Sequence, residues 1–437
     1  MCLPNTVLHH PSYYPEPSAT AGTEELENRN PRRLAYLAIL VVGVAFTLPR
    51  SVIASPQGKG VLALDVSVDR SRPEGPLDLL YAEQAADHES PLLFYQRSKE
   101  EGKSWTDPVR VDEGTSPPFS PHRGLDPQVA SHGDQVIAVW TTPGTDQWGS
   151  GPMATARSED GGVTWTAGPN PADDGLTTGH GFIDLVADLD GRFHLVWLDS
   201  RDQHQGLRYA RSEDGGQTWS KNLTIQQGTC ECCRNTLTVG ENGEIAVLYR
   251  DHNPRDMKIA SSSDHGKTWS AGKTAGIFDW EFEGCPHAGG GLAISIASTG
   301  QSGPSDRHAV VWTGATGRIG VYAVSQVAGE PTESITQLGL PTASYPDLAI
   351  WKGNTLAAVW VEHGSEGSPV RCAMKRFDQD SWHDPIVLDL ADSTATHPLV
   401  VPVPSGFRVF WTESIDGQGR WKSQAILARK SESRNDF

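Results

Sequence analysis

One polar turn, "RSEDGGQTWS" at residues 211–220, recurs along the chain and constrains the fold more than any other feature. Near copies are "RSKEEGKSW" from Arg97, "RSEDGGVTW" from Arg157 and "SSSDHGKTW" from Ser261, with a worn copy, "FDQDSW", from Phe377. The pattern offers a serine, an aspartate, a glycine and a tryptophan at fixed offsets. The aspartate accepts backbone N–H bonds, the glycine supplies a positive φ, and the tryptophan buries its ring beneath the turn. Each copy therefore predicts a self-capped hairpin.

A second pattern runs in step with the turns, in the form of short apolar strands that end in an aromatic residue. There are seven of them: "LDLLY" to Tyr81, "VIAVW" to Trp140, "FHLVW" to Trp197, "IAVLY" to Tyr249, "HAVVW" to Trp312, "LAAVW" to Trp360 and "FRVFW" to Trp411. Another apolar strand precedes most of them, a third follows, and one more is expected after the turn. The sequence thus predicts seven units of four strands.

Units of this kind predict an all-β protein, a β-propeller, because one four-stranded sheet cannot bury both of its faces and must stack around an axis. The propeller is expected over residues 59–430, with seven blades, or six if one unit is distorted. The last unit lacks a recognisable fourth strand, so we expect residues 59–64 to complete it and close the ring. Residues 431–437 are expected to form a C-terminal tail.

Composition and charge limit the partners of such a protein. Its 45 glycines, 30 prolines and 14 tryptophans suit a turn-rich β-protein. The formal net charge of −18 excludes nucleic acid and an anionic membrane as main partners, because the long-range field repels phosphate. A local basic pocket remains able to bind a small anion.

Residues 1–55 are predicted to be an N-terminal tail with an export signal. The apolar run "LAYLAILVVGVAFTL" from Leu34 follows "NRNPRR", and small residues near Val52, Ala54 and Ser55 offer a cleavage point. The run is short for a membrane span, although an uncleaved anchor is the alternative and would be the one link to a membrane. We therefore expect a periplasmic or extracellular protein.

The repeated turns resemble the Asp box, Ser-x-Asp-x-Gly-x-Thr-Trp, also called the BNR repeat, of the sialidase superfamily. The resemblance covers essentially the whole predicted propeller. It implies that the boxes lie on blade-edge hairpins away from the catalytic face, so Asp160, Asp214 and Asp264 are read as structural. By analogy with other propellers, the chemistry is expected where the first strand of each blade begins, around the axis.

Kinship with sialidases implies three arginines that clamp a carboxylate, a tyrosine activated by a glutamate, and an aspartate acting as general acid and base. Matched by order along the chain, the catalytic candidates are Tyr345 as nucleophile, Glu283 as its partner, Asp126 as the acid and Arg234 as one clamp member. The substrate-binding candidates are Asp184, Asp347, Arg123 and Arg255, and the wider pool of clamp arginines adds Arg201 and Arg318.

The sequence departs from the sialidase pattern at its start. The Phe/Tyr-Arg-Ile-Pro signature is absent, and the corresponding stretch "GVLALDVSVD" has no arginine. Tyr345 packing against a neighbouring blade, with Arg234 paired to an acid, is therefore the alternative to a catalytic site. The functions that remain are an exo-acting glycoside hydrolase on a sialic-acid-like or other sugar, a non-catalytic propeller that binds a glycan, a small anionic ligand or a protein, and a metal-binding or redox propeller that uses the cysteines and histidines described next.

A group of cysteines is the most distinctive local feature. "TCECCRN" at 229–235 precedes the first strand of the fourth unit, and "EGCPHAGGG" at 283–291 precedes that of the fifth, so the two segments should be neighbours at the channel mouth. Cys2 is expected to leave with the signal, and Cys372 stands alone. The other four, Cys230, Cys232, Cys233 and Cys285, suit two disulfides after export. The alternatives are a copper or zinc site that includes His287, with His180 or His397, and a redox-active pair. No other cofactor is indicated.

Overall fold

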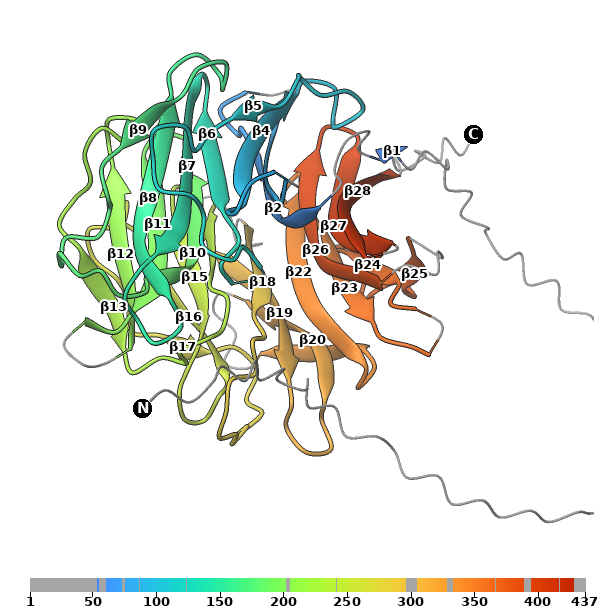
Figure 1. The fold of residues 1–437 in the computed structure, drawn as a ribbon. Helices are drawn as coiled ribbons and strands as arrows, with labels where there is room; N and C mark the ends of the chain where they lie inside the picture. Colours follow the sequence, from blue (N-terminus) through green and yellow to red (C-terminus); the bar gives the residue numbers. More distant parts are fainter. Residues whose placement is uncertain are drawn as a thin grey trace, which may run out of the picture. The chain divides into compact units, whose positions relative to one another are not determined.

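The computed structural model describes residues 53–54 and 60–427, apart from gaps at 73–74, 86, 123, 202–204, 241, 296–304, 328–332, 366, 389–393 and 416. Within this part the chain forms seven antiparallel sheets of four strands each, arranged as blades in a ring (Figure 1). The predicted all-β propeller with seven blades is confirmed. The export signal or anchor and the C-terminal tail lie outside the described residues. None of the described residues belongs to a helix of the length and apolarity needed to span a bilayer.

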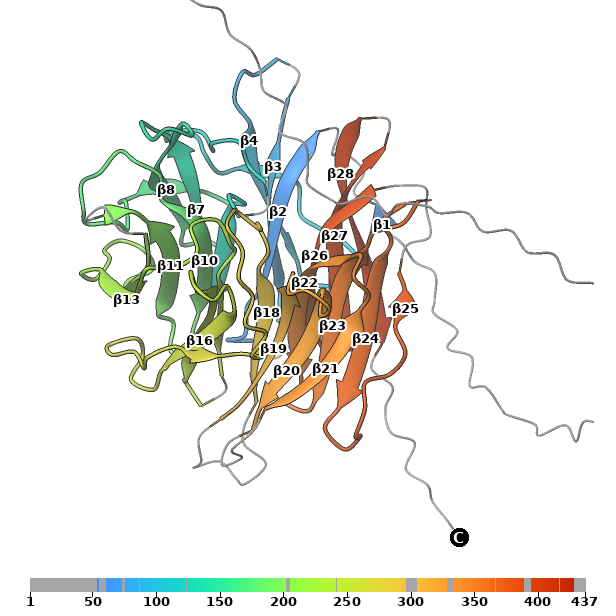
Figure 2. The same ribbon diagram turned by 90° about the horizontal axis from the view of Figure 1, so that it is seen from below.

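The innermost strand of each blade lies at one end of its sheet, and neighbouring innermost strands contact one another all the way round, from β2 through β26 and back to β2. These inner strands are β2 (Val61–Val68), β6 (Gln128–His132), β10 (Gly181–Ala187), β14 (Thr236–Val239), β18 (Gly290–Ser295), β22 (Ala343–Trp351) and β26 (Thr394–Val403). Figure 2 shows several of them side by side along the centre of the molecule. Residues far apart in the sequence therefore meet at the axis.

The second strands are the aromatic-ended strands predicted from the sequence. They are β3 (Leu77–Glu83), β7 (Gln135–Pro143), β11 (Phe193–Asp199), β15 (Ile245–Arg250), β19 (Asp306–Thr313), β23 (Thr355–Glu362) and β27 (Gly406–Ile415). All seven residues of β11 are buried, because a blade is covered on both faces by its neighbours. Trp140, Trp197 and Trp411 are fully buried and fill the space between blades.

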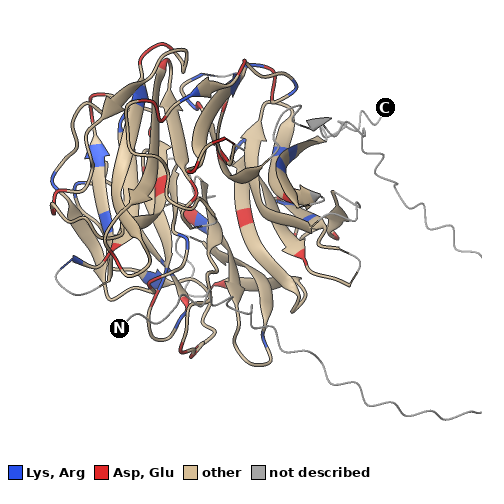
Figure 3. Ribbon diagram, in the orientation of Figure 1, with Lys and Arg blue, Asp and Glu red and all other residues tan. Residues whose placement is uncertain are grey.

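The third and fourth strands complete the blades toward the outside. The third strands are β4 (Leu92–Ser98), β8 (Ser150–Ser158), β12 (Gly206–Ser212), β16 (Met257–Ser262), β20 (Gly320–Gln326), β24 (Val370–Arg376) and β28 (Gln418–Leu427). The outer strands are β5 (Val109–Arg110), β9 (Thr166–Gly168), β13 (Leu223–Gln227), β17 (Lys273–Thr274), β21 (Ser334–Gly339), β25 (Ile386–Val387) and β1 (Ile53–Ala54). Charged residues lie mostly in the loops and turns that join the strands (Figure 3).

The ring closes differently from the expectation. The strand that completes the seventh blade is β1, whose Ile53 and Ala54 pair with Ser423 and Lys422 of β28, whereas residues 61–64 belong to the inner strand of the first blade. The N–H of Gly60 donates to the carbonyl of Gly419 at 2.8 Å and ties Gly60 to the same blade. The expectation for residues 59–64 was wrong because residues 61–64 are part of the inner strand at the axis.

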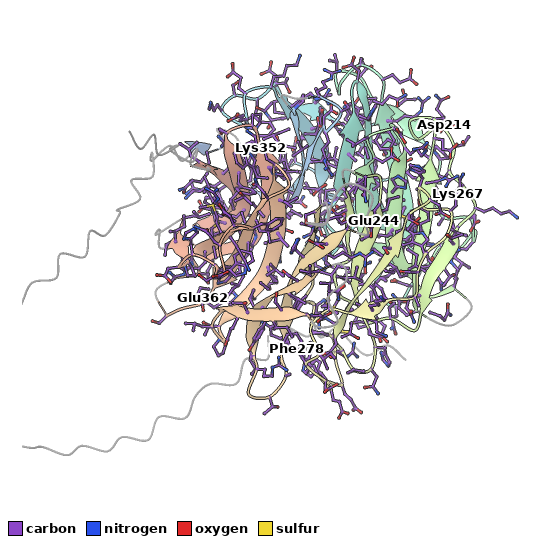
Figure 4. The ribbon with its side chains drawn as sticks, turned by 180° about the vertical axis from the view of Figure 1, so that it is seen from behind. Asp214, Glu244, Lys267, Phe278, Lys352 and Glu362 are labelled. Atoms are coloured by element: carbon purple, nitrogen blue, oxygen red, sulfur yellow. The ribbon has the colours of Figure 1, made fainter. Side chains whose placement is uncertain are left out.

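The Asp-box turns use their polar side chains within the turn. In the box of the third blade, Ser212 Oγ accepts from the N–H of Gly216 at 2.8 Å, and Asp214 accepts from the N–H of Thr218 at 2.9 Å. Partial burial raises the pKa of Asp214, but the hydrogen bonds from Thr218 outweigh this effect and lower that pKa. Asp214 lies at the periphery of the propeller (Figure 4).

Each box also packs onto the blade before it. The ring of Trp269, in the box of the fourth blade, meets Tyr209 of the third blade edge-on, with centroids 5.1 Å apart, and Trp165 meets Tyr95 in the same way at 5.1 Å. A Cβ added to Gly266 would lie 1.7 Å from Tyr209 Oη. The repeated turn therefore fastens one blade to the next, in addition to capping its own hairpin.

Candidate functional site

Four residues with strained backbone stand where inner strands begin. Phe182, His287, Tyr345 and His397 have φ values of 53°, 50°, 53° and 51°. The strand register shifts at three of these places, between Gly181 and Asp184, Ser344 and Asp347, and Thr396 and Leu399. A left-handed non-glycine residue costs about 1–2 kcal/mol, and such residues cluster at functional sites. We call this set the mouth residues.

Two mouth residues pack against each other. The ring of Tyr345 lies 4.4 Å from the ring of His397 and 6.2 Å from that of His363, measured between centroids. His397 also lines a small cavity together with Asp126. Tyr345 thus contacts His397, and His397 and Asp126 line one cavity.

Arg234 lies behind this group and is 7% exposed. Its Nε and Nη1 have no hydrogen-bond partner among the described residues. Although burial opposes the charged form, the carboxylates of Asp126, Asp347, Asp184 and Asp65 raise the pKa of Arg234. Its positive charge is therefore compensated inside the protein by a ring of acids.

Three of these acids also link neighbouring blades. Their carboxylates accept backbone N–H bonds from the next inner strand, and the pairs are Asp65 with Val129 at 2.8 Å, Asp184 with Leu237 at 2.6 Å and Asp347 with Val400 at 2.9 Å. Burial raises the pKa of Asp65 to about 7 and that of Asp184 to about 6. Together with Arg234 they line an axial cavity of about 350 Å³, whose other walls are largely aliphatic side chains.

The four cysteines and His287 meet beside the mouth, as the order of the blades predicts. We call these five residues the cysteine cluster. The Sγ atoms of Cys230, Cys232 and Cys233 lie within 4.8 Å of one another, and so do the ligand atoms of Cys232, Cys285 and His287. No two of the described cysteines are bonded to each other, so the predicted disulfides are not seen.

Buried cations face the cysteine cluster. Arg255 Nη1 donates to Cys230 Sγ at 3.0 Å, and its Nε donates to the carbonyl of Phe282 at 2.7 Å. Hydrogen bonding with Cys232 and Cys233, assisted by Arg255, lowers the pKa of Cys230. Burial raises the pKa of the Cys233 thiol to about 12. Arg255, predicted as a substrate-binding residue, is thus engaged with sulfur.

The remaining predicted residues lie apart from Tyr345 or outside the described chain. Glu283 is in the exposed segment before β18, and Arg123 lies outside the described residues. Arg201 is bound to Asp199, with Nη2 at 2.6 Å, and Arg318 donates to the carbonyl of Ile277 at 2.9 Å.

His180 does not join the cysteine cluster as one alternative proposed. Its Nε2 lies 3.0 Å from Asp174 and 3.9 Å from Asp199, in a separate buried network. Its side chain is fully buried there, one residue before β10 begins.

Sequence reasoning missed Phe182, whose side chain packs against the three buried cysteines. A signal for it was present, because the left-handed residue stands two positions before a buried aspartate in "FID" and in "YPD", as Gly124 does in "GLD".

Comparisons with known proteins agree with the geometry. The BNR repeat-like domain family matches residues 92–281. A sialidase of Bacteroides fragilis (strain YCH46) is 26% identical over 223 residues, which are 45% of this chain and 40% of that protein, so the chain matches less than half of its relative.

Solved structures share the fold at low sequence identity. The polysaccharide lyase Uly1 is 12% identical, with a TM-score of 0.53 over 85% of this chain and 90% of that one. An ulvan lyase bound to -[GlcA(1-4)Rha3S]- is 11% identical, with a TM-score of 0.51 over 85% and 95% of the two chains.

Proposed function

Because this chain is a BNR-repeat propeller of the sialidase superfamily, we propose that it is a glycoside hydrolase that acts at the axial mouth, with Tyr345 as the group that attacks the sugar. The observation that carries the proposal is the group formed by Tyr345, His397 and Asp126. Tyr345 has a strained backbone (φ 53°) and lies 4.4 Å from His397, which shares a cavity with Asp126.

The chemistry follows from these residue types. A phenol has a pKa of about 10 and needs a base to become a nucleophile at neutral pH. His397 takes the phenol proton in this proposal, in the role that the sequence suggested for Glu283. The phenolate attacks the anomeric carbon while Asp126 protonates the departing oxygen, and water then releases the sugar with Asp126 acting as base.

We propose a sugar other than sialic acid as the substrate. A sialic-acid clamp needs several free guanidinium groups around one carboxylate. Among the described candidates, Arg201, Arg255 and Arg318 donate to other protein groups, and four aspartates surround Arg234. A sugar without a carboxylate makes no demand on such a clamp.

A panel of fluorogenic glycosides, neutral sugars beside a sialoside, tests the proposal. We expect turnover of at least one neutral glycoside, and a loss of kcat of at least about 100-fold in Tyr345→Phe. Tyr322→Phe is the matched control, because Tyr322 is a buried core residue beside Phe278. This variant should turn over the glycoside at the wild-type rate. Equal rates for Tyr345→Phe and wild type would remove Tyr345 from the reaction.

A non-catalytic glycan-binding propeller is the second candidate, favoured by the absence of the sialidase signature near residue 61. It predicts no turnover of any glycoside, together with oligosaccharide binding that is lost in Tyr345→Ala. Binding measured by calorimetry beside the activity panel separates the two candidates.

We also propose that the chain is exported and that any signal is cleaved before Ile53. A cut after Ala54 would remove β1, which pairs with β28. N-terminal sequencing of the protein recovered from a periplasmic or medium fraction tests this, and a mature chain that begins after residue 54 would contradict it.

A further inference from the structure

The cysteine cluster joins two segments of adjacent blades at one point. Cys230, Cys232 and Cys233 come from the segment before β14 and are 1%, 5% and 1% exposed. Cys285 and His287 come from the segment before β18 and lie toward solvent. Since Cys232 belongs to both close groups, a buried set of sulfurs is continuous with a thiol and an imidazole at the surface.

The separations of the sulfur atoms suit ligands of one metal ion. Cys230 Sγ lies 3.3 Å from Cys233 Sγ and 3.9 Å from Cys232 Sγ. A disulfide needs about 2.05 Å. Thiolates about 2.3 Å from a tetrahedral zinc ion stand about 3.8 Å from one another. Three thiols on one side and a thiol and an imidazole on the other supply more than the four ligands that such an ion takes.

Two buried arginines beside the cysteine cluster also favour negatively charged sulfur ligands. Arg255 is 5% exposed, and it donates to Cys230 Sγ at 3.0 Å. Arg250 is 2% exposed and donates from Nε to the carbonyl of Ala288, next to His287, at 3.1 Å.

Buried guanidinium groups need anions nearby. Among the described residues, the half-exposed carboxylate of Glu231 lies 3.9 Å from Arg255 Nη1, whereas Cys230 Sγ lies at 3.0 Å and would carry a negative charge as a ligand of a metal ion.

We propose that the cysteine cluster binds one thiophilic metal ion, Zn²⁺ or Cu⁺. Soft thiolate ligands with an imidazole select these ions over Mg²⁺ and Ca²⁺. Each thiol that becomes a ligand releases its proton on binding. Phe182 packs over the three buried cysteines and shields that side of the site.

Metal content of the purified full chain tests the proposal. We expect about one zinc or copper per chain by mass spectrometry, and about one Co²⁺ per chain with thiolate-to-cobalt charge-transfer absorption after exchange. Cys232→Ser should lose the ion and the absorption. Cys372→Ser is the matched control, because Cys372 is buried outside the cluster at 1% exposure and should keep both.

A variant that fails to fold does not decide the matter, because the wild-type chain gives an independent readout. Cluster thiols should resist alkylation until a chelator removes the metal. Peptides of the unreduced protein that carry Cys230–Cys233 and Cys232–Cys285 disulfides, with no metal, would overturn the proposal. So would free thiols that take up neither Zn²⁺ nor Cu⁺. Neither result depends on glycoside turnover, so the experiment tests the metal site independently of the proposed hydrolase activity.

Discussion

Replacing Gly266 by alanine tests whether the box turns fasten blade to blade. The new Cβ would lie 1.7 Å from Oη, 2.4 Å from Cζ and 2.9 Å from Cε1 of Tyr209. Ordinary contact needs at least about 3.4 Å, so the ring must leave its place. Tyr209 is 1% exposed, and its Oη shares a 2.7 Å hydrogen bond with His194 Nδ1.

The expected cost has three parts. The left-handed backbone, φ 78°, costs alanine about 1–2 kcal/mol. Overpacking adds about 1–3 kcal/mol, and disturbing the bond to His194 adds about 1 kcal/mol. Gly317→Ala is the matched control, because Gly317 has nearly the same φ, 76°, and a Cβ there would meet nothing within 4 Å. The free energy of unfolding of Gly317→Ala should fall only by the backbone contribution.

Urea unfolding followed by tryptophan fluorescence measures the difference. With a slope of about 3 kcal/mol per molar urea, the midpoint of Gly266→Ala should fall below that of Gly317→Ala by about 1 M. Tyr209→Leu removes the ring that the new Cβ would meet. Gly266→Ala should therefore lower the urea midpoint by less in the Tyr209→Leu background than in the wild-type chain. Equal midpoints for the two alanine variants would refute the idea that the turn is seated on the preceding blade.

Three further predictions concern the axis, a box and the ring closure. Burial raises the pKa of Asp65 to about 7 in the folded chain, whereas an unfolded aspartate titrates near 3.9. The contribution of Asp65 to the free energy of unfolding should therefore fall by up to about 4 kcal/mol as pH rises from about 4 to about 7. Asp65→Asn should flatten that fall in urea midpoints measured across this range, and an unchanged slope would count against it. Ser212→Ala leaves the N–H of Gly216 without its acceptor and should cost about 1–2 kcal/mol by the same assay. A chain that begins at Gly60 lacks β1 and should melt several degrees lower, and an unaltered melting temperature would show that β1 adds nothing to the seventh blade.

The sequence predicts the propeller well because its two strongest patterns are local. The aromatic ends of the second strands recur in all seven blades and the box turns in five of them, and each pattern has a short-range physical cause. β1 has only two residues, next to a long apolar run, so no periodicity marks it. Its place depends on pairing with β28 at the other end of the chain.

The parts of the site that depend on the order of the blades could be predicted from the sequence. The contacts that depend on how far a side chain extends from its loop could not. The two cysteine segments were expected to meet because consecutive inner strands begin side by side. Arg255, by contrast, belongs to a stretch, "RDHNPRD", that reads as a solvated turn. Its contact with Cys230 depends on the path of residues 251–256, which no local pattern specifies.

The pairing of β1 with β28 has a consequence for how the molecule is made. A nascent chain can stack its blades one upon another as they emerge, in the order of synthesis. The seventh blade cannot be finished in that way, since its outermost strand is synthesised first and its other three last. β1 therefore has no pairing partner until residues 418–427 have been synthesised, and the ring can close only after that point.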